Sequence, residues 1–101
     1  MEESLRALRI LIEKLNTLVK KINPSDDLYK IEDYIETIKN VIMDIEDKIE
    51  DLDYEFEKVE FPNQRQLYFK FCDYKSDFEN IKVFYKKKKA EVMAEIDKKF
   101  L

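Results

Sequence analysis

Hydrophobic residues recur along the chain at alternating spacings of three and four, the period of one face of an α-helix. The longest such run lies between residues 28 and 59, where the alternation continues through ten positions without a miss. These positions are Leu28, Ile31, Ile35, Ile38, Ile42, Ile45, Ile49, Leu52, Phe56 and Val59. Such regularity is typical of a helix in a coiled coil or a helical bundle. The pattern therefore predicts a long helix over about residues 24–60.

Two further stripes flank this helix. The first predicts a helix over about residues 4–22, with apolar residues at Leu5, Leu8, Ile12, Leu15, Val19 and Ile22. Leu11 and Leu18 widen that stripe, so this helix should have two neighbours rather than one. The second predicts a helix over about residues 62–100, through Leu67, Phe71, Tyr74, Phe78, Ile81, Tyr85, Val92 and Ile96. Its phase shifts at the lysine run 86–89.

Prolines mark the two breaks between the predicted helices. Asn23 is a favourable N-cap, and Pro24 suits the first position of the following helix. Pro62 disfavours the helical conformation at Phe61, the residue before it, and can open the third helix. We therefore expect breaks near residues 23–25 and 60–63.

These elements predict an all-α fold, a single helical domain over residues 1–101. Short connections make consecutive helices antiparallel. The second and third helices, about 55 Å long, should outreach the first, about 30 Å. We expect an antiparallel three-helix bundle from which the long pair extends as a coiled-coil hairpin. In this arrangement the first helix covers residues 28–45 and leaves residues 49–59 uncovered. Flanking charges support the register, with Asp53 facing Lys75 and Glu46 facing Lys82.

Composition excludes several kinds of chemistry. The chain has no Gly and no His, so phosphate-binding glycine loops and catalytic triads that need His are missing. Carboxylate pairs such as Glu32 and Glu36, or Glu57 and Glu60, have helical spacing, but among 23 acidic residues such pairs arise by chance. We expect no enzyme activity, no cofactor and no metal site. No apolar run reaches the roughly 18 residues of a membrane span, and one cysteine favours a reducing cytoplasm.

Charge is unevenly distributed although the net charge is only −4. Residues 24–60 carry 14 acidic and four basic side chains, a balance of −10, whereas the segments before and after it are basic. The basic residues of the third helix suggest an alternative role in binding nucleic acid. The candidate residues for that role are Lys82, Lys86, Lys87, Lys88 and Lys89. A solvated helix face explains the lysine run better, because Glu91, Glu95 and Asp97 follow it at once.

Aromatic residues gather around the second break, where residues 53–74 contain seven of them. Tyr54, Phe61, Tyr68 and Phe69 lie off the apolar stripe, and aromatic side chains are enriched at protein interfaces. We predict that they and Cys72 bind a partner at the hairpin tip, although Cys72 also suits an ordinary small helix residue. The partner is another protein, with a second copy of this chain one option. The alternative is that the rings only cap the coiled coil.

Overall fold

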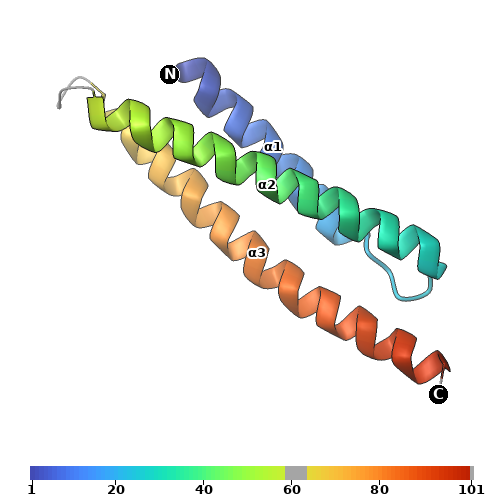
Figure 1. Cartoon of the computed structure of the whole chain (residues 1–101). Helices are drawn as coiled ribbons and strands as arrows, with labels where there is room; N and C mark the ends of the chain where they lie inside the picture. Colours follow the sequence, from blue (N-terminus) through green and yellow to red (C-terminus); the bar gives the residue numbers. More distant parts are fainter. Residues whose placement is uncertain (59–63, 101) are drawn as a thin grey trace.

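The computed structural model describes residues 1–58 and 64–100, and these residues form three helices. Helix α1 spans Glu2–Lys21, α2 spans Leu28–Lys58 and α3 spans Arg65–Phe100. They form a rod of 59 × 18 × 17 Å (Figure 1). The described part of the chain is 91% helical and contains no strand. This confirms the predicted all-α three-helix bundle with a short first helix.

One continuous apolar core runs along the rod. Its α1 members are the residues of the predicted stripe, all buried: Leu5, Leu8, Ile12, Leu15 and Val19. The core residues of α2 are Ile31, Ile38, Val41, Ile45, Leu52 and Phe56, and those of α3 are Phe71, Phe78, Tyr85, Val92 and Ile96. Among the described residues no polar or charged residue other than Tyr85 belongs to this core. Burial of apolar surface is therefore the main stabilising contribution.

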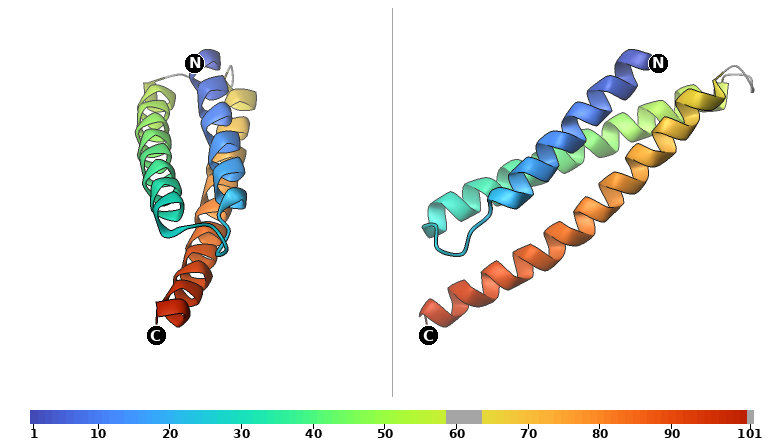
Figure 2. Two further views of the ribbon diagram at one scale, coloured as in Figure 1. Left: turned by 90° about the vertical axis from the view of Figure 1, so that its right-hand side faces the viewer. Right: turned by 180° about the vertical axis from the view of Figure 1, so that it is seen from behind.

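Two hydrogen bonds from α3 show where α1 ends along the rod and where the connection to α2 runs. The Lys88 ammonium donates to the Lys20 carbonyl at the end of α1, at 3.0 Å. The Lys99 ammonium donates to the Pro24 carbonyl in the connection to α2, also at 3.0 Å. Lys88 and Lys99 are eleven residues apart, about 16 Å along a helix. The connection therefore runs on along α3 after α1 has ended (Figure 2).

This connection moves α1 toward the α2–α3 tip, so the predicted coverage is wrong. The start of α1, at Glu2 and Leu5, lines the same pocket as Leu67 in the first turn of α3. Leu52 and Phe56, which we expected to be uncovered on one side, are 0% and 5% exposed. A tight turn would have held α1 at the other end of the rod, but the extended connection does not.

Helix α2 begins at Leu28, four residues after the predicted start. The Asn23 side chain does not cap it, because its Oδ1 accepts hydrogen bonds from the backbone N–H and the hydroxyl of Ser25. Asp27 caps the helix instead, its Oδ1 accepting from the Lys30 N–H at 2.9 Å. Asn23 therefore closes a turn around Pro24, and the helix starts only where the next suitable side chain occurs.

The three helices do not pack equally. Helix α1 packs closely against both long helices, and α2 and α3 approach each other at fewer positions. One predicted cross-pair is confirmed, since Lys75 and Asp53 lie 3.5 Å apart. Lys82 instead pairs with Glu79 of its own helix at 2.9 Å, so the predicted contact with Glu46 is wrong. The bundle is thus organised around α1 rather than around a long α2–α3 coiled coil.

The second predicted break, at 60–63, lies outside the described residues. The helices on either side of it end at Lys58 and begin at Arg65, which brackets the predicted position.

Candidate functional site

The tip of the bundle contains an aromatic cluster that joins α2 to α3. Phe56 stacks on Phe71 with ring centres 5.3 Å apart. Tyr68 meets Phe56 edge to face at 5.4 Å and lies 6.5 Å from Phe71. Tyr68 is partly buried against the core. This predicted partner-binding residue therefore packs within its own chain.

The other predicted tip residues that the structure describes are divided between two helices, with Tyr54 on α2 and Phe69 and Cys72 on α3. Tyr54 and Phe69 are 59% and 58% exposed. Tyr54 borders a hollow on α2 whose remaining lining is acidic: Glu50, Asp51, Asp53 and Glu57. Phe69 lies on α3, three residues before the half-buried Cys72 and so on the same side of that helix. Phe61 lies outside the described residues. The partner-binding role of these residues remains a prediction.

The incomplete approach of α2 and α3 leaves an apolar stripe partly exposed. Phe56 contacts α3, and Ile49, Ile42 and Ile35 precede it at intervals of seven, so they lie on the same side of α2. All three isoleucines are only partly buried, whereas Ile38 and Ile45 of the same helix are 0% exposed. Because α2 and α3 approach each other at few positions, the side of α2 that faces α3 is less buried than the side that carries Ile38 and Ile45.

Two lysines line the facing side of α3. The ammonium of Lys75 lies 4.5 Å from the centre of the Phe71 ring, and that of Lys82 lies 4.6 Å from the Phe78 ring. Both are half buried. Their aliphatic stems shield the apolar core on this side. We call this surface, formed by Ile35, Ile42 and Ile49 of α2 with Lys75 and Lys82 of α3, the α2–α3 seam.

The lysines of the alternative nucleic-acid site separate into two groups. Lys82 pairs with Glu79, and Lys88 donates to the Lys20 carbonyl, so both have roles in the fold. The remaining three, Lys86, Lys87 and Lys89, are exposed on α3. The run therefore does not present a single basic face.

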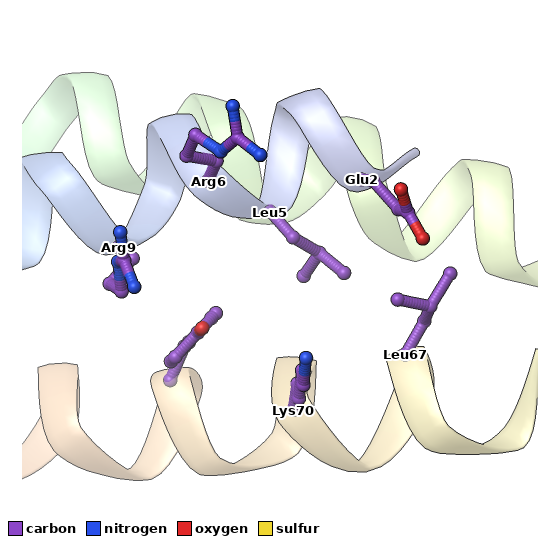
Figure 3. A pocket seen from close by; sticks show the side chains of 7 residues that line it. Glu2, Leu5, Arg6, Arg9, Leu67 and Lys70 are labelled. Atoms are coloured by element: carbon purple, nitrogen blue, oxygen red, sulfur yellow. The ribbon is translucent and has the colours of Figure 1, made fainter.

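A small basic pocket opens between α1 and α3 near the tip. Its volume is about 280 Å³, and its lining residues are Glu2, Leu5, Arg6, Arg9, Leu67, Lys70 and Tyr74 (Figure 3). The view shows Glu2, Arg6 and Arg9 on α1, and Lys70 on the facing α3. Three cationic side chains and one carboxylate therefore line this pocket, in a protein that is acidic overall.

The sequence contains no local signal for this pocket. Arg6 and Arg9 are three residues apart on α1, as Lys70 and Leu67 are on α3, which places each pair on one side of its helix. No local sequence pattern predicts that this side of α1 and this side of α3 face each other. That juxtaposition follows from the shift of α1 along the rod, which depends on how the 22–27 connection is laid out.

Comparisons with protein-family models, with characterised proteins and with solved structures yield no match. In the described part of the chain, no helix is both long enough and apolar enough to cross a membrane. The same residues contain no group of three Cys, Asp or Glu side chains arranged to hold a metal ion.

Proposed function

We propose that this protein is a non-enzymatic interaction module that binds another protein through the α2–α3 seam. The partly buried isoleucine stripe carries the proposal. Ile35, Ile42 and Ile49 continue the heptad pattern to which the buried Phe56 belongs, but they are only partly buried against the core. A helix laid along the seam would bury them and complete a four-helix arrangement.

Charge favours a second copy of the chain as the partner. The ion pair between Asp53 and Lys75 shows that these two residues lie at the same height along the rod. A twofold axis parallel to the rod preserves this height, so Asp53 of one copy would face Lys75 of the other. One heptad away, Glu46 would face Lys82 in the same manner. The acidic α2 of each copy would then lie beside the basic α3 of its partner.

The half-buried Cys72 extends this surface toward the tip, because it lies three residues before Lys75 and on the same side of α3. Phe69 lies two residues before the buried Phe71 and therefore on nearly the opposite side of α3. We leave Phe69 out of the contact. Tyr54 faces the acidic hollow on α2, so we do not include it in the contact.

The test is the substitution Ile42→Lys, with Met43→Lys as its control. Ile42 belongs to the seam, whereas its neighbour Met43 is 53% exposed on the outer side of α2. Both variants add the same charge to the same turn of the helix. Sedimentation equilibrium up to millimolar concentration should show self-association of the wild type and of Met43→Lys, and its loss in Ile42→Lys.

Circular dichroism must show that Ile42→Lys keeps its helix content. Equal association of the two variants would place the contact elsewhere. A wild type that stays monomeric throughout the range would exclude self-association, and affinity capture with the same pair of variants would then test for a different protein partner.

A further inference from the structure

We infer that the pocket between α1 and α3 binds a phosphate monoester. The inference is independent of the seam, because the pocket is formed by residues of α1 and α3 alone. The observations are the number of cations, the absence of an ion pair at two of them, the apolar floor and the size of the hollow.

The first observation is an excess of positive charge with little internal compensation. Arg6, Arg9 and Lys70 line the pocket with Glu2 as the single carboxylate, a net charge of +2. The Arg9 Nε also forms a loose ion pair with Glu13, at 3.8 Å from its Oε1. Within the described residues, Arg6 and Lys70 form no ion pair within 4.0 Å. Two cations therefore remain available to an anion from outside.

The donor chemistry fits a phosphoryl group. Arginine offers several N–H donors in a fixed planar arrangement, and lysine adds a mobile ammonium. The Tyr74 hydroxyl, also in the pocket lining, can donate a further hydrogen bond. A phosphate monoester carries a charge of about −1.5 to −2 at neutral pH, which matches the net charge of the lining.

The shape of the pocket and its apolar floor favour a phosphate ester over free inorganic phosphate. Leu5 and Leu67 supply apolar surface from the two helices, on which the carbon atoms of an ester can rest. The volume of about 280 Å³ lies just below the usual range for small-molecule sites, roughly 300–1,000 Å³. It suits one phosphorylated group, carried either by a small metabolite or by a side chain of another protein.

The test is a titration followed by NMR amide shifts, using glycerol phosphate as the metabolite probe and a short phosphoserine peptide as the protein probe. At least one probe should shift the amides of Leu5, Lys70 and Tyr74. The tighter of the two identifies the source of the phosphoryl group. Absence of shifts with both probes would overturn the inference.

Two matched variants separate the pocket from general attraction to basic residues. Arg6→Gln with Lys70→Gln should weaken binding by at least about tenfold, because two charge-assisted hydrogen bonds are lost. Lys14→Gln with Lys87→Gln removes the same charge from exposed sites outside the pocket and should change the affinity less than twofold. Equal losses in the two variants would overturn the inference.

A third variant should bind the phosphate probe more tightly than the wild type. Glu2→Gln removes the only carboxylate of the pocket lining and should tighten binding about threefold, since like-charge repulsion is removed. Equal or weaker binding by this variant would contradict the proposed ligand. Shifts that are largest at residues 86–89 would place the phosphate on the lysine run instead and would also overturn the inference.

Discussion

At the scale of single residues, the burial of each isoleucine side chain decides how much it contributes to the free energy of unfolding. Ile45 is 0% exposed and Ile42 is half buried at the seam, whereas Ile10 on α1 is 53% exposed. Replacement by Ala should cost about 3 kcal/mol at Ile45 and about 1 kcal/mol at Ile42. At Ile10 it should cost less than about 0.5 kcal/mol. Urea unfolding measures all three, and an equal loss at Ile42 and Ile45 would mean that the seam is closed.

Two adjacent aromatic residues near the tip should respond differently to a charge. Tyr68 packs against Phe56 and Phe71, whereas Phe69 is 58% exposed. Tyr68→Glu should lower the free energy of unfolding by about 2–3 kcal/mol, because it places a carboxylate among rings. Phe69→Glu should change it by less than about 0.5 kcal/mol. Thermal denaturation compares the two, and similar melting temperatures would contradict the description of Tyr68 as part of the fold.

Tyr85 links stability to alkaline pH. Burial in the core raises the pKa of its hydroxyl above the ordinary value of 10.0. The neutral phenol is therefore favoured in the folded state, and this contribution is fully present below pH 10. It is lost as the pH rises through the raised pKa. Tyr85→Phe should lose less stability than the wild type between pH 8 and about 11.

Urea unfolding at both pH values measures this loss. Tyr29→Phe is the control, because that ring is 80% exposed. Lysine deprotonation affects all three proteins alike, so only the difference between them counts. Identical pH dependence of the wild type and Tyr85→Phe would contradict the linkage.

At the scale of helices, the start of α2 depends on one carboxylate. Asp27 accepts the Lys30 N–H at 2.9 Å and occupies the capping position. Asp27→Ala should lower stability by about 1 kcal/mol. Asp33→Ala, at an exposed position one turn into the helix, should have less than half that effect. Chemical denaturation compares them, and a larger loss for Asp33→Ala would mean that the helix begins elsewhere.

The predictable part of this fold is the part that local patterns encode. Heptad spacing identified the three helices and the buried stripe of α1, because side chains that recur every 3.6 residues share one face. The start of α2 was misplaced because Asn23 suits a turn as well as a cap, and only competition with Asp27 decides between them. Turn chemistry at residues 23–27 then sets how far α1 extends along the rod. That shift, which no periodicity records, determines both the burial of Leu52 and the existence of the basic pocket.

At the scale of the whole molecule, the rod shape distinguishes modes of self-association. One copy measures 59 × 18 × 17 Å. Two copies joined along the α2–α3 seam should keep the long dimension near that of one copy and widen only the cross-section. Contact through the tips alone would nearly double the length. Small-angle X-ray scattering at several concentrations gives the maximum dimension, and a value approaching twice the monomer length would exclude the seam as the contact.

The parallel course of α1 and α3 has a mechanical consequence. Met1 lies near the tip, whereas α3 ends at the opposite end of the rod (Figure 1). A force applied between these two points therefore acts along the helix axes. It slides α1 against α3 and must break many side-chain contacts at once, instead of peeling them apart one turn at a time. Rupture under load is governed by the unfolding rate, so pulling in this direction should meet far more resistance than pulling across the rod.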